Sequence, residues 1–389
     1  MIEKKINFDV LLVLVLLLFP IGTLISGVFG VVNKILFALL IVIQAINFFS
    51  HKITPRAIII ILLTLICHIF AVTSTVFPLY NFNDFFYFGY TVVYFLYILD
   101  NGEDFCNALN KCKKYINVVM SIWTAIIVIS IFFPVSYLTN GANTTFVSFS
   151  GDTFRLGPSC LFIMSLAFFQ MRQTNKKINI IWVVLPMICL LLGSARTYFV
   201  LGSFMCIVAL RSFFKKQEHF IASLLPVGIA IGVFVIFGGI GQKFVDSLQE
   251  SQYFDALGKF TSGRSVFWVA DMEAFFNQDF FNQVFGSGFN FVYDVNQLAI
   301  YNKIWAHNDF IQLLTTFGYL GLGIYLALMY SMFKKYFKIA KIKNGLVIFS
   351  IVMVWLFNAF FNMFYVYFCS MLSFPLILLA YMPKREGDN

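Results

Sequence analysis

His307 is the residue of this 389-residue sequence best placed for chemistry, and only four histidines occur in all. It opens a long apolar run that begins Ala306-His-Asn-Asp-Phe310. The positive end of a helix dipole disfavours protonation of a nearby imidazole, so we expect a neutral ring. A neutral imidazole can take a proton from a hydroxyl as a general base. The alternative is an amphipathic residue that marks a membrane boundary.

Three arginines stand beside small or flexible residues at predicted helix starts. They are Arg155, Arg196 and Arg264, within residues 152–158, 193–197 and 261–265. A guanidinium beside a helix N-terminus makes an anion site that suits phosphate oxygens. Serines in or beside these turns are candidate helix caps and substrate ligands: Ser194, Ser262 and Ser265. The alternatives are a snorkelling anchor, a solvated loop arginine and, for Arg155, an ion pair with Asp152.

The elements that must position these residues are membrane helices. Hydrophobic residues make up 60% of the chain and charged residues 12%, against about 25% charged in soluble domains. This composition excludes a soluble globular chain and a nucleic-acid binder. Continuous apolar runs of about 20 residues predict helices rather than barrel strands. We predict an all-α, polytopic membrane bundle of about twelve transmembrane helices, at residues 9–28, 31–49, 56–75, 84–99, 115–135, 157–171, 178–193, 196–212, 220–240, 307–333, 344–362 and 365–382.

The distribution of Lys and Arg predicts the orientation of the bundle. If both termini are cytoplasmic, the outer side holds few of the 27 cations: Lys34, Arg155, Arg196, Lys243, Lys259, Arg264 and Lys303. Such an asymmetry follows the positive-inside rule. We therefore expect a multi-pass protein of the cell membrane whose site is extracytoplasmic, and the net charge of +9 needs no polyanionic partner.

Residues 241–306 are predicted to form one large extracytoplasmic loop between spans 1–9 (residues 1–240) and spans 10–12 with a cytoplasmic tail (residues 307–389). Segments of this length usually carry function. Ser265–Phe276 has apolar residues at helical spacing (Val266, Val269, Ala270, Ala274), which predicts an amphipathic helix on the membrane surface. The nearest match to a metal-binding Asp-x-Asp is Asp271-Met-Glu273, for which we expect a solvated helix face.

The residues after His307 have a distinctive spacing. His307-Asn308 is followed after nine residues by Gly318 and then by Gly321, giving H-N-x9-G-x-x-G. Small residues at such intervals allow close helix packing, which would fix the helix that presents the imidazole. Here the chain resembles the O-antigen ligase/polymerase superfamily of bacterial envelope polysaccharide enzymes, as do its Ser-Arg turn at 194–196, its Gly-Arg-x-x-x-Trp segment at 263–268 and its Gly286-Ser-Gly288 loop.

The resemblance covers about residues 150–335 and implies a reaction. Such enzymes transfer a glycan from a polyprenyl diphosphate to an acceptor hydroxyl on the outer face. The resemblance gives catalytic roles to His307, Arg264 and Arg196, substrate contacts to Arg155 and Asn308, and structural roles to Gly286, Gly288, Gly318 and Gly321. It implies no metal, nucleotide or ATP, and as partners the lipid-linked oligosaccharide, membrane lipid, a chain-length regulator and a flippase.

Three functions remain open from the sequence. The first is polymerisation of lipid-linked repeat units by an inverting, metal-independent glycosyl transfer. The second is a ligase that moves the finished glycan to a lipid or protein acceptor. The third is a flippase or other secondary transporter of polyprenyl-linked glycans. A transporter is expected to carry ionisable groups deep in its spans, and His68 is the one such residue near a span centre.

Overall fold

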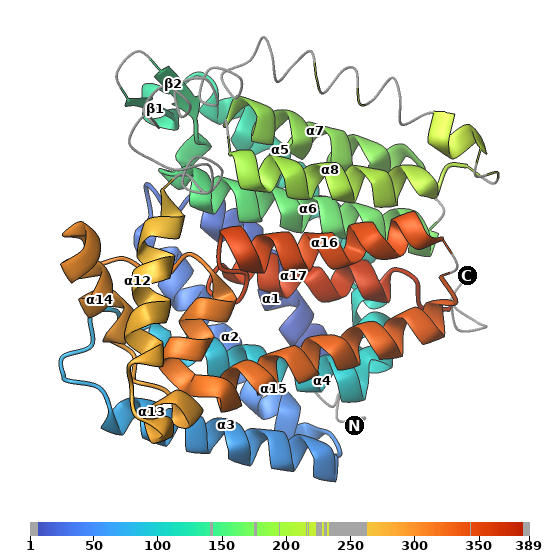
Figure 1. Ribbon diagram of the computed structural model, residues 1–389. Helices are drawn as coiled ribbons and strands as arrows, with labels where there is room; N and C mark the ends of the chain where they lie inside the picture. The colour runs from blue at the N-terminus through green and yellow to red at the C-terminus, as the bar shows by residue number, and fades with distance from the viewer. Residues whose placement is uncertain are drawn as a thin grey trace.

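The computed structural model is an assembly of helices with one small strand pair (Figure 1). It describes residues 7–383 except for 141–142, 175–176, 194, 215, 217, 223–227, 229–231, 233–262 and 343. The helices and strands are α1 (Phe8–Leu24), α2 (Gly30–Ser50), α3 (Pro55–Thr73), α4 (Asp84–Lys111), α5 (Lys113–Ser130), β1 (Tyr137–Asn140), β2 (Asn143–Phe146), α6 (Thr153–Thr174), α7 (Ile181–Leu192), α8 (Arg196–Arg211), α12 (Arg264–Phe276), α13 (Phe280–Phe285), α14 (Phe291–Ile300), α15 (Asp309–Ala340), α16 (Gly345–Phe361) and α17 (Phe368–Leu379). Short 3₁₀ turns add η1 (Pro134–Ser136), η2 (Ser148–Ser150) and η3 (Lys177–Ile180).

The chain is an all-α membrane protein, and the described residues do not confirm the predicted number of twelve spans. Within the described residues, five helices are long and apolar enough to cross a bilayer: α2, α3, α5, α6 and α15. Four shorter apolar helical stretches accompany them: α1, η3 with α7, α16 and α17. The expected span 84–99 is the first part of a longer helix, α4, which bends at Asn101 and continues through a charged stretch. Most of the expected span 220–240 lies outside the described residues.

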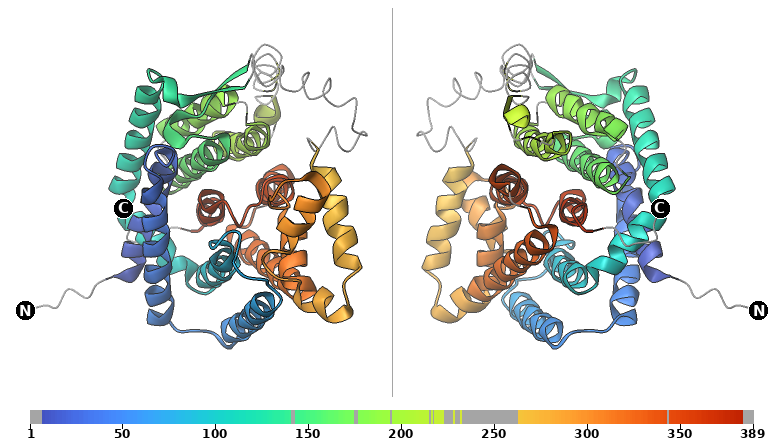
Figure 2. Two further views of the ribbon diagram at one scale, coloured as in Figure 1. Left: turned by 90° about the vertical axis from the view of Figure 1, so that its left-hand side faces the viewer. Right: turned by 90° about the vertical axis from the view of Figure 1, so that its right-hand side faces the viewer.

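The outward faces of the helices show why this fold needs lipid. Large apolar side chains of α3 are exposed, namely Ile58, Ile59, Leu62, Leu65 and Ile69. Water would penalise so much exposed apolar surface, whereas a bilayer solvates it. By contrast, nearly all of α17 is buried, and Figure 2 shows this helix in the interior of the bundle, against α6. An α-helix that is apolar all round fits such an interior position.

The helices α12–α14 gather at one end of the bundle. In Figure 1, α12 lies across the direction of the long helices α6, α8 and α15. The helix expected at 265–276 is therefore present, but its expected apolar face is not the face that packs. Val266 and Val269 are exposed, while Trp268, Asp271 and Phe275 are buried against the bundle. The preceding α5–α6 connection holds the β1–β2 hairpin, which the span pattern did not predict.

Candidate functional site

His307 lies at the end of the bundle where α12–α14 gather, immediately before α15. Its backbone is left-handed, with φ of 50°. The imidazole ring centroid is 6.1 Å from that of Phe154, and 6.5 Å from those of Phe267 and Trp305. Its Nδ1 atom is buried and has no hydrogen-bond partner in the described part of the chain. Because buried polar atoms are rarely left unpaired, this nitrogen has capacity for a ligand.

The surroundings of His307 keep its imidazole neutral. Burial and, as the smaller cause, the nearby positive charge of Arg264 together lower the pKa of His307 to about 4. At neutral pH the ring therefore carries no charge and retains one lone pair. The imidazole is thus neutral, as expected, but the causes are burial and the charge of Arg264, which the helix-dipole argument did not include.

Arg264 begins α12 and connects it to the end of α16. It follows Gly263, whose φ of 81° is left-handed, and its Nη1 donates to the carbonyl oxygen of Phe361. A guanidinium has five N–H donors, so one carbonyl fixes its position without exhausting its capacity. Burial lowers the pKa of Arg264, and the charge of Arg196 lowers it as well. Arg196, at the start of α8, is thus within electrostatic range of Arg264.

Three residues predicted to be catalytic therefore come together from distant parts of the chain. Arg264 acts electrostatically on His307, and Arg196 acts on Arg264. Within the described residues, neither Arg264 nor His307 forms an ion pair with a carboxylate. A buried guanidinium such as that of Arg264, beside a neutral imidazole, favours binding of an anion.

Asn308, for which a substrate contact stays a prediction, caps α15 with its side-chain oxygen. Its Oδ1 accepts from the backbone nitrogens of Phe310 at 2.9 Å and Ile311 at 3.2 Å. The side chain is 2% exposed. Asparagine is among the best N-cap residues because its oxygen satisfies free N–H groups of the first turn. The structure thus gives Asn308 the role of holding the helix start that carries His307.

A buried polar network around Asp309 also holds the start of α15. Tyr325 donates its hydroxyl to Asp309 Oδ2 at 2.7 Å, and Trp355 Nε1 donates to the Tyr325 hydroxyl at 2.9 Å. The backbone nitrogen of Tyr365 reaches the same carboxylate oxygen at 3.4 Å. The network joins α15 to α16 and to the segment before α17, so it orients the residues beside His307. The sequence analysis did not single out Asp309, although it follows the His-Asn pair directly.

The glycines expected to have structural roles meet across α13 and α15. Gly318 interrupts α15 with φ of 67°, and a Cβ there would lie 2.3 Å from the carbonyl oxygen of Val284. Gly286 has φ of 96°, and a Cβ there would lie 2.1 Å from the carbonyl oxygen of Thr316. Ser287 N donates to Thr315 O at 2.8 Å across this contact. Only glycine permits both the backbone conformation and the approach.

The other two glycines of the pattern differ in their surroundings. Gly288 has φ of 95°, and a Cβ there would lie 2.6 Å from the Thr75 hydroxyl at the end of α3. At Gly321 a Cβ would lie 2.2 Å from Cβ of Phe317, on the preceding turn. The close packing expected of H-N-x9-G-x-x-G is thus against the backbone of residues 284–286, rather than against a long helix.

Asp271 corrects one expectation for α12. It is fully buried rather than solvated, and neither carboxyl oxygen has a hydrogen-bond partner among the described residues. Burial raises the pKa of Asp271 to about 8, so the carboxyl is mostly protonated at neutral pH. A neutral acid packed inside the bundle is a poor ligand for a metal.

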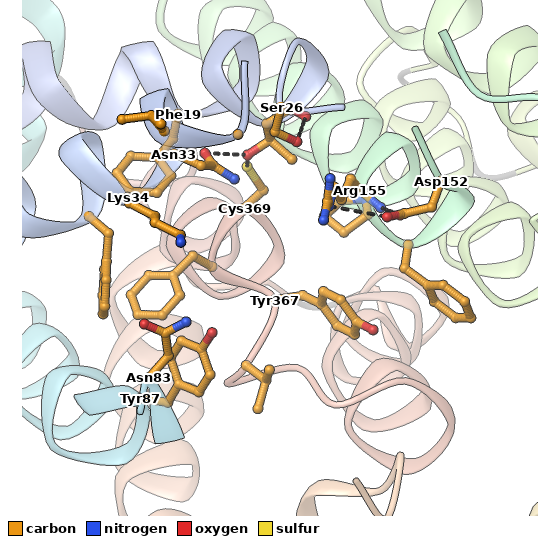
Figure 3. Close-up of a pocket in the computed structure, with 18 of the residues that line it drawn as sticks. Phe19, Ser26, Asn33, Lys34, Asn83, Tyr87, Asp152, Arg155, Tyr367 and Cys369 are labelled. Carbon is orange, nitrogen blue, oxygen red and sulfur yellow. Dashed lines mark hydrogen bonds and ion pairs between the residues drawn. The ribbon is translucent and has the colours of Figure 1, made fainter. Parts of the chain in front are cut away.

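Arg155 lies next in sequence to Phe154, whose ring packs on His307, but its guanidinium has different partners from that of Arg264. Its Nε is 3.1 Å from Asp152 Oδ2, and its Nη1 donates to Ser150 O at 3.3 Å. The ion pair considered as an alternative in the sequence is therefore present, as the dashed lines in Figure 3 show. Both residues line a cavity of about 650 Å³ that also reaches Trp305 and Lys34.

Two aromatic residues, Phe154 and Tyr367, stack on each other beside His307. The ring of Phe154 lies 6.2 Å from that of Tyr367 and nearly parallel to it, and 6.1 Å from the imidazole. The Tyr367 hydroxyl group is within electrostatic range of Arg264 and Asp152. Sequence analysis missed both rings. Phe154 was detectable as the neighbour of Arg155, whereas no pattern marked Tyr367.

The remaining predicted ligands contribute less. Ser265 is described and is 6% exposed, so it lies inside the contact between α12 and the bundle. Ser194 and Ser262 lie outside the described residues. His68 packs against Phe317, with the two ring centroids 5.0 Å apart, and its Nδ1 lies 2.8 Å from Thr64 O and its Nε2 3.2 Å from Phe85 O. A neutral imidazole has one N–H group, so it can donate to one of these two carbonyl oxygens at a time.

No family model matches this sequence, and no curated protein matches it either.

Proposed function

We propose that this protein polymerises lipid-linked polysaccharide repeat units, transferring a glycan from a polyprenyl diphosphate to an acceptor sugar hydroxyl. The observation that carries the proposal is the convergence of a neutral His307 with the buried guanidinium group of Arg264, on which Arg196 acts electrostatically. The combination suits a reaction that needs one base and one anion site. The resemblance of the His-Asn, Gly-Arg and Ser-Arg segments to the O-antigen ligase/polymerase superfamily points in the same direction.

The chemistry divides between the two kinds of side chain. His307 accepts the proton of the acceptor hydroxyl, and the oxygen forms a bond to the anomeric carbon. The bond from that carbon to the phosphate oxygen breaks, and its electron pair leaves with the diphosphate. Arg264 and Arg196 stabilise the charge that develops on the leaving oxygens. One displacement through an oxocarbenium-like state inverts the anomeric centre and leaves no sugar on the enzyme.

The coupling of Arg264 to His307 gives the substrate a part in activating the base. A base with a pKa near 4 is weak, and a general base works best when its pKa is near the working pH. A diphosphate bound at Arg264 offsets the positive charge that disfavours the imidazolium. The pKa of His307 should therefore rise when the donor binds, so the base becomes stronger only in the loaded site.

We also propose that this end of the bundle faces the outside of the cell membrane. Helices α4, α6, α8 and α15 each carry a basic residue in the last turn, namely Lys111, Arg172, Arg211 and Lys338. The start of α15, beside His307, lies at the other end of that helix. Basic residues collect on the cytoplasmic side, which supports an extracytoplasmic site.

The test is transfer by the purified protein from a synthetic polyprenyl-diphosphate oligosaccharide, without added nucleotide. Native protein should lengthen the glycan, and His307→Ala and Arg264→Ala should lose most of the rate. The exposed His219→Ala and Arg56→Ala, both remote from the cluster, are matched controls and should retain it. Full activity in His307→Ala would disprove the role of the base. Products formed only with a lipid or protein acceptor would assign the ligase reaction instead.

A further inference from the structure

A cavity beside the catalytic cluster is built largely from the N-terminal part of the chain. Its volume is about 650 Å³, within the range of small-molecule sites. Residues from α1, α2, α4 and α6 line it, together with the segment before α17. Figure 3 shows Lys34 on α2 and Arg155 on α6 at different sides of the cavity. No motif in the first 140 residues had indicated a site there.

The charges of this lining are unbalanced. Arg155 is paired with Asp152, which is the single carboxylate in the lining among the described residues. Lys34 makes no ion pair with any residue that the structure describes. An ammonium group directed at a partly enclosed cavity attracts an anion, and the neutralised Arg155 pair does not compensate it.

Backbone contacts fix α2 relative to the start of α6. Gly27 N donates to Phe149 O at 3.0 Å, and a Cβ on Gly27 would lie 2.6 Å from Gly151 N. The α1–α2 turn therefore lies directly on the loop that precedes Arg155. Thr23 further ties the turn to Asn33 at 3.3 Å and to Cys369 at 3.1 Å. The position of Lys34 is thus a property of the folded bundle rather than of a loose terminus.

The cavity shares a wall with the catalytic cluster. Phe154, Trp305 and Tyr367 line the cavity, and the rings of Phe154 and Trp305 also contact the His307 imidazole. Aromatic rings give sugar-sized ligands flat apolar contacts, and the amide and hydroxyl groups of the lining supply hydrogen bonds. A ligand in the cavity can therefore present a hydroxyl towards His307 while its charged end stays near Lys34.

We propose that this cavity is the acceptor subsite and that Lys34 binds the phosphate of the acceptor, a lipid-linked glycan. The proposal rests on the proposed function. The leaving diphosphate of the donor binds at Arg264 and Arg196, so each substrate has its own cation. The acceptor of a polymerase carries a phosphate like its donor, which explains why a second cationic site adjoins the first.

Two blocked substrates separate the sites. An acceptor analogue with a methylene in place of the oxygen between sugar and phosphate cannot act as donor. A donor analogue with methylated terminal hydroxyls cannot act as acceptor. Lys34→Gln should raise the KM for the acceptor analogue about tenfold, as expected for loss of a charge-assisted hydrogen bond. The KM for the donor analogue should stay within about twofold of the native value.

The control is Lys303→Gln, since Lys303 stacks on the Tyr80 ring at 3.6 Å and does not line the cavity. Equal acceptor KM values in the two variants would overturn the subsite while leaving the proposed function intact. Direct binding of the acceptor analogue needs no turnover. Binding that depends on Lys34, in a protein without transferase activity, would retain the subsite and reject the function.

The source of the phosphate is tested by competition. The same glycan on a neutral alkyl chain should bind native protein and Lys34→Gln equally weakly. Phosphatidylglycerol in mixed micelles should compete poorly with the acceptor analogue, because it lacks the glycan that fills the cavity. Competition as strong as that of the glycan phosphate would identify a general lipid headgroup site and overturn the acceptor assignment.

Discussion

Arg155 and Arg264 have similar local sequences, since each lies beside small residues at the start of a helix. The fold nevertheless gives them different partners. Arg155 pairs with Asp152 three residues earlier, and the two side chains are 46% and 35% exposed. Arg264 is tied to the carbonyl of Phe361 from a distant helix, and its charge acts on His307 and Arg196. The first arginine is neutralised locally, and the second keeps its positive charge for the site.

The two arginines differ in burial and in the partner that holds each guanidinium. A half-exposed pair such as Arg155–Asp152 contributes little energy because water screens it. A buried guanidinium without a carboxylate is unfavourable until an anion arrives, so it favours ligand binding over stability. The fold therefore places a buried positive charge close enough to the imidazole to lower its pKa.

Replacement of each arginine by lysine should distinguish the two residues most clearly, through the transfer rate. Arg264→Lys should lower the transfer rate about 100-fold or more, because a point charge replaces a bidentate fork at developing phosphate charge. Arg155→Lys keeps a cation for Asp152 and should cost less than about tenfold. Steady-state rates with the polyprenyl-diphosphate donor measure both. Similar losses in the two variants would show that the carboxylate does not distinguish the arginines.

The close contact of Gly318 with the backbone of Val284 should contribute to the stability of the protein. Gly318→Ala places a side chain at φ of 67° and 2.3 Å from Val284 O, so it should destabilise the protein by at least about 1–3 kcal/mol. Gly323→Ala in the same helix meets nothing within 4 Å and should be neutral or stabilising, by up to about 1 kcal/mol. Thermal unfolding in detergent compares them. Equal melting temperatures would mean that the backbone at Gly318 adapts freely.

The pH dependence of the transfer rate should also distinguish the two arginines, and here we expect the smallest effect. A histidine base is active when deprotonated, so the rate falls as pH drops below its pKa. The acid limb of kcat/KM should lie near pH 4 in the free enzyme, and that of kcat at higher pH once a diphosphate is bound. Arg264→Gln removes a charge that lowers the pKa of His307, so its kcat/KM limb should move to higher pH.

Arg155→Gln is the control for this profile, because no effect of Arg155 on His307 is among the causes of the lowered pKa. Its limb should stay with that of the native protein. A limb that moves equally in both variants would place Arg155 in the same electrostatic site and remove the contrast between the two arginines.

The sequence predicted the helical membrane architecture because apolar runs of this length have no other stable solution in lipid. It also predicted helix starts near Arg155, Arg196, Arg264 and His307, since each follows small or polar residues. The number of spans stays a prediction, because α4 continues into a charged stretch, several apolar helices are short and most of residues 220–240 lies outside the described residues. The helical periodicity predicted α12 and its exposed apolar stripe at Val266 and Val269, but it did not mark the second face, with Trp268, Asp271 and Phe275, that packs on the bundle.

What the sequence determined alone is which segments are helical, which residues could supply a base or bind an anion, and which glycines allow left-handed backbone. Only the tertiary structure decided which partner each of these side chains has. Asp152 pairs with Arg155, Phe361 accepts from Arg264, and Arg264 acts on His307. Lys34 lines the neighbouring cavity. The physical reason is the separation along the chain over which each kind of interaction acts. Helix formation and capping depend on neighbours within one or two turns, whereas burial, electrostatic coupling and cavity shape depend on residues that folding brings together from distant positions.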